Sequence, residues 1–167
     1  RKWESPRCHR KVMAHAGAAG VHRLIVTGTS VEATRQALQL RREWPDRLFV
    51  TCGIHPHHAV DCTPEAVEAL AELARDPAVV AIGECGLDYF RNFSPREAQL
   101  RAFRAQLELA VKVGKPVFLH QRDAHDDFIA VLAEFRPALV DGVAHCFTGH
   151  ARELEECLAH DLAIGIT

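Results

Sequence analysis

VVAIGECGLD, residues 79–88, is the stretch that decides how this chain folds. Its apolar run ends at Gly83 and is followed at once by a carboxylate, Glu84. A strand with so apolar a run is buried on both faces, which is typical of a parallel sheet covered by helices. In such folds the carboxyl ends of the strands open into the functional site. The stretch therefore predicts a parallel α/β fold with Glu84 at its functional end.

Similar apolar runs recur along the chain, and several end in a polar group. His120 follows the run at residues 116–119, and His145 follows residues 140–144. Because the carboxyl ends of parallel strands meet at one edge of a sheet, we expect Glu84, His120 and His145 to share one pocket. In all, the apolar runs predict six strands, at residues 24–26, 48–50, 79–82, 117–119, 140–144 and 162–166.

Helix-like segments lie between these runs and predict βαβ units. Thr63 followed by Pro64 predicts a capped helix start. Ser94 and Glu97 have capping-box spacing and predict another. The helix after Ser94 is expected to pack through an apolar stripe at Leu100, Phe103, Leu107, Ala110 and Val111. Further helices are predicted at residues 32–43, 124–135 and 152–160.

The length leaves two α/β architectures open. The chain has 167 residues, whereas a complete (β/α)₈ barrel usually needs about 250 and rarely fewer than about 200. An incomplete TIM barrel and an open α/β sheet both fit six strands. Residues 1–11 are basic, carry no strand signal and are predicted to be irregular. Residues 12–167 are predicted to form one domain.

Composition excludes several classes of protein. No apolar stretch approaches the roughly 20 residues that span a bilayer, so no membrane association is expected. The net charge of −2 argues against a globally basic nucleic-acid surface, although metal ions and local arginines can still hold phosphates. No GxGxxG or P-loop motif occurs, which argues against a nucleotide cofactor. The six cysteines form no CxxC pair, which favours a reduced, cytoplasmic protein.

The residues at the strand ends suggest a metal site. One histidine in such a place is more often an ordinary core or surface residue. Glu84, His120 and His145 occupy three equivalent positions, however, and this favours a shared role. Imidazole and carboxylate are usual ligands of Zn²⁺, Mn²⁺ and Fe²⁺, and carboxylates suit Mg²⁺.

Three further residues are candidates for contact with a substrate. His55 lies after another predicted strand, where it is either a solvated loop residue or a phosphate-facing one. Arg122 follows His120 by two residues, so in a strand it points to the same side, where it either binds phosphate or pairs with a nearby aspartate. Asp88 either orients a ligand or water or stabilises a turn.

Five segments resemble the TatD family of metal-dependent deoxyribonucleases, within the amidohydrolase-like TIM barrels. They occur in order and at the separations expected for that family, and the resemblance covers residues 12–167. The segments are GIHPH at 53–57, AIGECGLDY at 81–89, RNFS at 91–94, PVFLHQRDAH at 116–125 and HCFTG at 145–149.

The resemblance implies that Glu84, His120 and His145 are catalytic ligands of a divalent cation, with Glu84 bridging two ions. It implies that His55 and Arg122 line the substrate cleft. Mg²⁺ is the expected ion, with Mn²⁺ or Zn²⁺ as alternatives. The implied reaction is hydrolysis of phosphodiester bonds in DNA, 3′ to 5′ on single strands, with RNA as a further substrate.

The family's first strand, with its His-x-His pair, and its last strand, with an acidic ligand, have no counterpart in this sequence. The resemblance therefore implies a truncated form, an open wall made of strands two to seven of eight, with two exposed edges. Two other functions stay open. The same scaffold can hydrolyse a small ester or amide, or the chain can be a non-catalytic barrel fragment.

Overall fold

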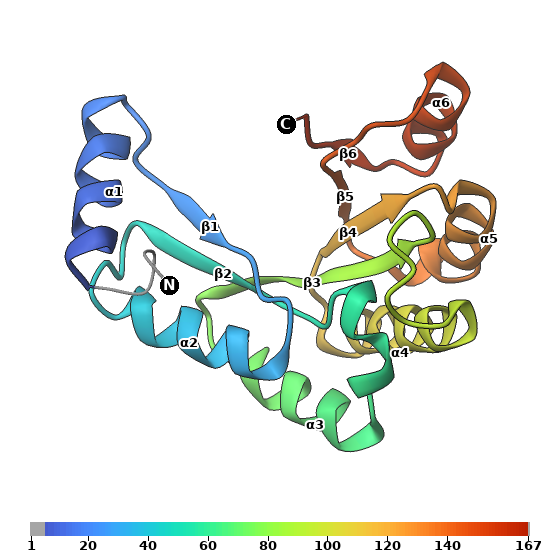
Figure 1. Cartoon of the computed structure of the whole chain (residues 1–167), viewed down its shortest axis with the longest axis horizontal. Helices are drawn as coiled ribbons and strands as arrows, with labels where there is room; N and C mark the ends of the chain where they lie inside the picture. Colours follow the sequence, from blue (N-terminus) through green and yellow to red (C-terminus); the bar gives the residue numbers. More distant parts are fainter. Residues whose placement is uncertain (1–5, 167) are drawn as a thin grey trace.

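The computed structural model describes residues 6–166 (Figure 1). Within this range six strands form a single parallel sheet whose spatial order follows the chain. The strands are β1 (Leu24–Val26), β2 (Leu48–Cys52), β3 (Val79–Asp88), β4 (Val117–Arg122), β5 (Gly142–His145) and β6 (Ala163–Ile164). A doubly wound sheet reverses its strand order at a switch point, whereas a barrel does not. The uninterrupted order and the curl of the sheet in Figure 1 identify a barrel-type half rather than an open, doubly wound sheet.

The connecting helices lie outside the curl, with α2, α3, α4 and α5 along the convex side of the sheet (Figure 1). Two short 3₁₀ turns, Pro56–Asp61 and Arg136–Ala138, follow β2 and α5. None of the helices in the described range is long and apolar enough to cross a membrane. The α-helices are α1 (Pro6–Ala18), α2 (Val31–Arg41), α3 (Pro64–Leu73), α4 (Arg96–Val113), α5 (His125–Phe135) and α6 (Ala151–Ala159).

Helix α1 corrects the prediction for the start of the chain. Residues 6–11 are helical, so the prediction of an irregular end was wrong for them. Residues 1–5 lie outside the described residues. The prediction relied on the absence of a strand pattern, and the basic side chains of this segment obscured its helical spacing. The division into residues 1–11 and 12–167 stays a prediction.

The two predicted helix starts had different outcomes. Thr63 caps α3, since its side chain accepts a hydrogen bond from the backbone N–H of Ala66. Ser94 does not cap α4, which begins at Arg96 after Pro95 without a side-chain cap. Instead the Ser94 hydroxyl donates to the backbone oxygen of His57 at 3.0 Å. The capping-box prediction was therefore wrong, because a tertiary contact engages the side chain.

The core lies between the sheet and the convex-side helices. Phe103 of α4 and Phe128 of α5 are fully buried there, with stacked rings whose centroids are 5.5 Å apart. In β4, Val117 and Leu119 join this core, so the alternating side chains Phe118 and His120 project from the opposite, concave face. The strand period thus directs the polar ends of the strands away from the helices.

Candidate metal centre

Glu84 owes its position to a bulge in β3. Gly83 pairs with Phe118 and Cys85 pairs with Leu119, so Glu84 is an extra residue with no partner in β4. A bulge of this kind re-aims a side chain and is common beside active sites. Cys85 keeps its place in the core while the Glu84 carboxylate turns toward the polar strand ends.

The bulge requires glycine next to Glu84. Gly83 has a φ of +137°, and a Cβ there would lie 2.0 Å from the backbone oxygen of Phe118. A Cβ on Gly53 would lie 2.5 Å from the backbone of Gly83. The backbone N–H of Glu84 donates to the Gly28 oxygen at 2.8 Å. Close backbone approach from both sides therefore fixes Glu84, and no other residue type fits at these two glycines.

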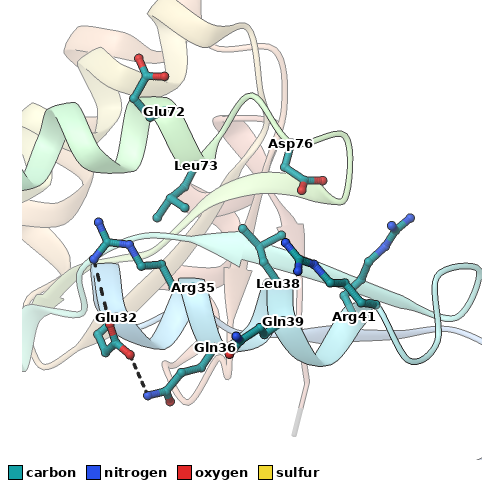
Figure 2. A pocket seen from close by; sticks show the side chains of 10 residues that line it. Glu32, Arg35, Gln36, Leu38, Gln39, Arg41, Glu72, Leu73 and Asp76 are labelled. Carbon is teal, nitrogen blue, oxygen red and sulfur yellow. Dashed lines mark hydrogen bonds and ion pairs between the residues drawn. The ribbon is translucent and has the colours of Figure 1, made fainter.

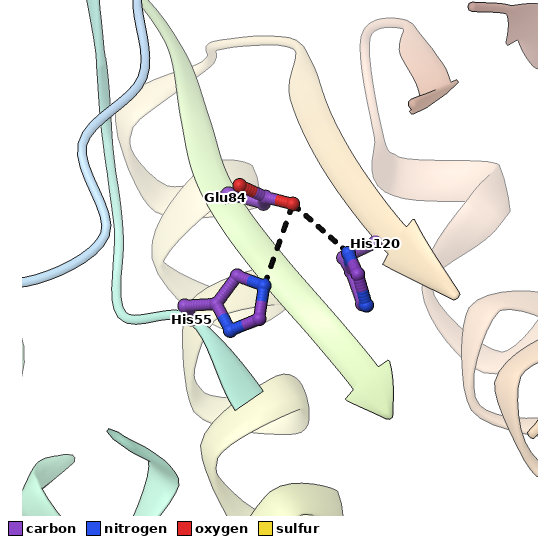
Figure 3. Close-up of side chains that lie close together, drawn as sticks. All are labelled: His55, Glu84 and His120. Atoms are coloured by element: carbon purple, nitrogen blue, oxygen red, sulfur yellow. Dashed lines mark hydrogen bonds and ion pairs between the residues drawn. The ribbon is translucent and has the colours of Figure 1, made fainter. Parts of the chain in front are cut away.

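His55 from the loop after β2, Glu84 from β3 and His120 from β4 lie together (Figure 3). Each offers one candidate ligand atom, and these atoms lie within 4.8 Å of one another. Oε1 of Glu84 is 2.9 Å from Nδ1 of His120 and 3.5 Å from Nε2 of His55. The three side chains are largely buried.

Glu84 is an anion under all ordinary conditions. Burial would raise the pKa of its carboxyl group, but the hydrogen bonds from His120 and His55 outweigh burial and hold the pKa at about 2. Burial lowers the pKa of His55, which favours its neutral form. A buried carboxylate beside neutral imidazole is the donor chemistry that suits a divalent cation.

His120 is the histidine whose hydrogen bonding fits a metal ligand best. Its Nδ1 lies against Glu84, so that nitrogen carries the proton and Nε2 holds the free electron pair. Nε2 is buried and has no hydrogen-bond partner within the described residues. Oδ2 of Asp88 lies 3.4 Å from it. Metal-binding histidines commonly donate their other N–H to a carboxylate in this way.

His55 fits a different role. Its Nδ1 accepts the backbone N–H of His57 at 3.1 Å, so the proton of the neutral ring sits on Nε2 and faces Glu84. A nitrogen that carries a proton cannot bind a cation. His55 is therefore better suited to donate a hydrogen bond than to hold a metal, although it lies among the candidate ligands.

Asp88 lies beside this cluster and stabilises a turn, one of the two functions considered for it from the sequence; its role in orienting a ligand or water stays a prediction. Oδ1 accepts the backbone N–H of Arg91 at 2.8 Å and so stabilises the turn after β3. Oδ2 lies 2.7 Å from Nε2 of His57. Burial would raise the pKa of Asp88, but the Arg91 backbone N–H and the His57 ring outweigh it and lower the pKa. A second carboxylate thus faces the free Nε2 of His120.

Two buried glutamines of α4 hold the loops that carry these residues. Gln106 accepts the Ile54 N–H at 2.7 Å and donates to the Ile54 oxygen at 3.0 Å, next to His55. Gln99 accepts the Asp88 N–H at 2.8 Å and donates to the Asp88 oxygen at 3.1 Å. Each side-chain amide therefore replaces a missing backbone partner where a strand ends.

The structure brings together Glu84, His120, His55 and Asp88, and it leaves two predicted residues outside the cluster. His145 pairs in register with His120, but its ring packs on Phe118 with centroids 4.5 Å apart. Within the described residues, no hydrogen bond or ion pair links the imidazole nitrogens of His145 to Glu84. Arg122 lies over the Phe90 ring at 4.6 Å and 3.8 Å from Asp123, the aspartate pairing considered for it.

Sequence reasoning assigned no individual role to His57, Gln99 or Gln106. The contact of His57 with Asp88 joins residues 31 positions apart in the chain, so no local sequence pattern could reveal it. The glutamines do carry a weak signal. Both lie on the helix face that includes Phe103, where a polar residue at a core position needs a buried partner.

A second hollow, of about 600 Å³, lies between α2 and α3, away from the strand ends (Figure 2). Its side chains carry both signs of charge. Glu32 accepts a hydrogen bond from Gln36 at 3.0 Å and lies 4.0 Å from Arg35, and Glu72 lies 3.1 Å from Arg75. This self-paired lining gives no preference for a ligand of either charge.

Comparisons with known proteins agree with this geometry. The family model described as TatD related DNase matches residues 5–167. A protein of Erwinia tasmaniensis named 3'-5' ssDNA/RNA exonuclease TatD is 51% identical over 157 residues, which is 94% of this chain and 61% of that protein. A Klebsiella pneumoniae protein of the same name is 48% identical over 161 residues, 96% of this chain and 61% of that protein. The chain thus spans about three fifths of the length of these relatives.

Solved structures show the same fold. A TatD homologue from Escherichia coli superposes with a TM-score of 0.87 at 29% identity, covering 97% of this chain and 64% of that one. A TatD family hydrolase from Entamoeba histolytica gives a TM-score of 0.85 at 29% identity, covering 93% of this chain and 55% of that one. The family model covers nearly the whole sequence, and the chain belongs to the TatD related DNase family.

Proposed function

We propose that this chain carries the metal site of a nuclease that hydrolyses phosphodiester bonds of single-stranded DNA from the 3′ end, with RNA as a second substrate. The observation that carries the proposal is the buried Nε2 of His120, which has no hydrogen-bond partner within the described residues and lies 3.4 Å from the Asp88 carboxylate, while the Glu84 carboxylate holds Nδ1 of the same ring. The names of the relatives support the substrate and the direction.

In this proposal Glu84 and His120 hold a divalent cation, and His145 on the neighbouring strand is a third catalytic ligand. Carboxylate and imidazole without a thiolate cluster favour Mg²⁺ or Mn²⁺ for activity, with Zn²⁺ as a tighter-binding alternative. When bound, the cation supplies Lewis-acid polarisation of the scissile phosphate. His55 lines the substrate cleft with its Nε2–H directed at Glu84, Asp88 orients His57, and Arg122 binds the strand.

We also propose that β1 to β6 correspond to strands two to seven of an eight-stranded barrel. The curl of the sheet and its sequential strand order support a barrel-type assembly, and the numbering rests on the family resemblance. Cytoplasmic localisation stays a prediction from the cysteine pattern. Two of the cysteines, Cys52 and Cys85, are buried thiols inside strands.

The test is hydrolysis of a single-stranded oligonucleotide labelled at its 5′ end. We expect a ladder that shortens from the 3′ end, no products in EDTA, and recovery with Mg²⁺ or Mn²⁺. A strand with a 3′-terminal phosphorothioate linkage controls for direction. Undiminished cleavage in EDTA would exclude the metal mechanism. Cleavage of carboxylic esters or amides with no cleavage of the strand would point to a small-ester or amide hydrolase, and cleavage of neither would indicate a non-catalytic scaffold.

A further inference from the structure

The loop between β3 and α4, residues 89–95, presents two aromatic side chains to solvent. Phe90 is 56% exposed and Phe93 is 68% exposed. Aromatic rings bring a large apolar area, so leaving two of them uncovered in one loop is costly and marks a contact surface. The other exposed large apolar side chains of the described residues are aliphatic, namely Val12, Val21, Ile25, Val60, Val111, Val140, Leu158 and Ile166.

The loop that carries the two rings is fixed at both ends. The Ser94 hydroxyl donates to the His57 oxygen at 3.0 Å, and Gln99 donates to the Ser94 oxygen at 2.8 Å. At the other end, the Arg91 N–H donates to Asp88 at 2.8 Å. The rings are therefore held in place before any ligand arrives, which lowers the entropic cost of binding to them.

The Phe93 ring adjoins the candidate metal centre. The Phe93 ring centroid lies 4.8 Å from that of His57, in an edge-on arrangement. The His57 ring in turn lies 4.2 Å from that of His55 and 6.4 Å from that of His120. The His57 imidazole thus separates the Phe93 ring from His55 and His120. The distance from the Phe93 ring to these two residues is on the scale of one nucleotide.

Positive groups flank the Phe90 ring. The guanidinium of Arg122 lies 4.6 Å from the Phe90 ring centroid and that of Arg91 lies 5.6 Å from it. Arg122 is 44% exposed, and the carboxylate near it, Asp123, is 3.8 Å away. Aromatic faces interleaved with guanidinium groups match the alternation of bases and phosphates in a single strand.

We propose that Phe90 and Phe93 stack against unpaired bases of the single strand whose terminal phosphodiester enters the metal site, while Arg91 and Arg122 contact its backbone phosphates. This inference rests on the proposed nuclease function. A stacked phenyl ring contacts the flat face of the base and not the sugar, so the same contact forms with DNA and with RNA strands. It excludes paired bases, whose faces are covered by their neighbours, and this accounts physically for a preference for single strands.

The test is binding of fluorescein-labelled 12-nucleotide thymidine and uridine strands, compared with an abasic strand that has the same phosphates. Anisotropy is measured in EDTA at low salt, so that no strand is cleaved. The unmodified protein is expected to bind the thymidine and uridine strands at least about 100-fold more tightly than the abasic one, since two rings stack and each stacked base contributes about 1–3 kcal/mol. Phe90→Ala and Phe93→Ala should each reduce this preference about 10-fold, and the double variant should abolish it.

Matched variants separate stacking from a general structural effect. Phe93→Trp should preserve the preference, because indole stacks as well as phenyl. Leu158→Ala, at an exposed apolar residue of α6, should leave it unchanged. A preference that survives in the double variant, or no preference in the unmodified protein, overturns the stacking role. Because no hydrolysis is measured, failure of the nuclease proposal would appear in the cleavage assay and not in this one.

Discussion

Glu84→Gln is expected to reduce the rate of metal-dependent strand hydrolysis by at least about 100-fold. Substitution of residues that merely support metal ligands costs about 10- to 100-fold in affinity or activity, so loss of the central anion should cost more. The variant keeps the shape of the side chain and replaces a carboxylate whose pKa is about 2 with a neutral amide. Cleavage rates of a labelled strand and Mn²⁺ affinity by titration calorimetry measure the effect.

The same substitution on an exposed helix is the control. Glu68→Gln in α3 removes an equal charge far from the strand ends and should leave both the rate and the Mn²⁺ affinity unchanged. Thermal unfolding monitored by circular dichroism establishes that both variants fold. If the Glu84→Gln protein binds Mn²⁺ and cleaves DNA as well as the unmodified protein, Glu84 is not a metal ligand.

Gln106→Leu is expected to lower the free energy of unfolding by about 2–5 kcal/mol and to reduce activity as well. The leucine is of similar size but leaves the N–H and the C=O of Ile54 buried without partners, and each unsatisfied group costs about 1–3 kcal/mol. Ile54 precedes His55, so its loop relaxes together with the residue that faces Glu84. Urea unfolding gives the stability, and cleavage of the single strand gives the activity.

Gln39→Leu in α2 tests whether the loss is specific to the buried position. Gln39 is exposed, so its replacement should change the unfolding free energy by less than about 0.5 kcal/mol. An equally small effect at Gln106 would mean that Ile54 finds other partners, and that the side-chain amide does not position His55.

The sequence predicted the architecture well because each strand is an apolar run that stops at a polar residue. All six predicted strands are present, and β1 has the predicted bounds. The apolar stripe of α4 is buried at Phe103, Leu107 and Ala110, whereas Val111 is exposed. The barrel curl did not follow from apolar periodicity, since a flat and a curled sheet share the same pattern.

The site was only partly predictable, for reasons of register. The expectation that polar residues following apolar strands meet at one edge of the sheet placed Glu84 and His120 together, and the structure confirms their contact. This expectation cannot detect the bulge at Glu84, because one unpaired residue leaves the apolar run intact. Nor can it show which way an imidazole turns. His145 reaches the predicted register, yet its ring lies along Phe118, and its role as a ligand stays a prediction.

The two glutamine contacts of α4 also constrain how the sequence can vary. Gln99 and Gln106 are seven residues apart, close to two helical turns, so both amides leave the same side of the helix. Inserting or deleting one residue between them would rotate one amide by about 100° relative to the other and release one loop. Loops on either side of α4 can therefore change length and take up new substrates, while the segment between the glutamines keeps a fixed number of residues. When foreign loops are grafted onto this scaffold, the number of residues between Gln99 and Gln106 should therefore stay the same.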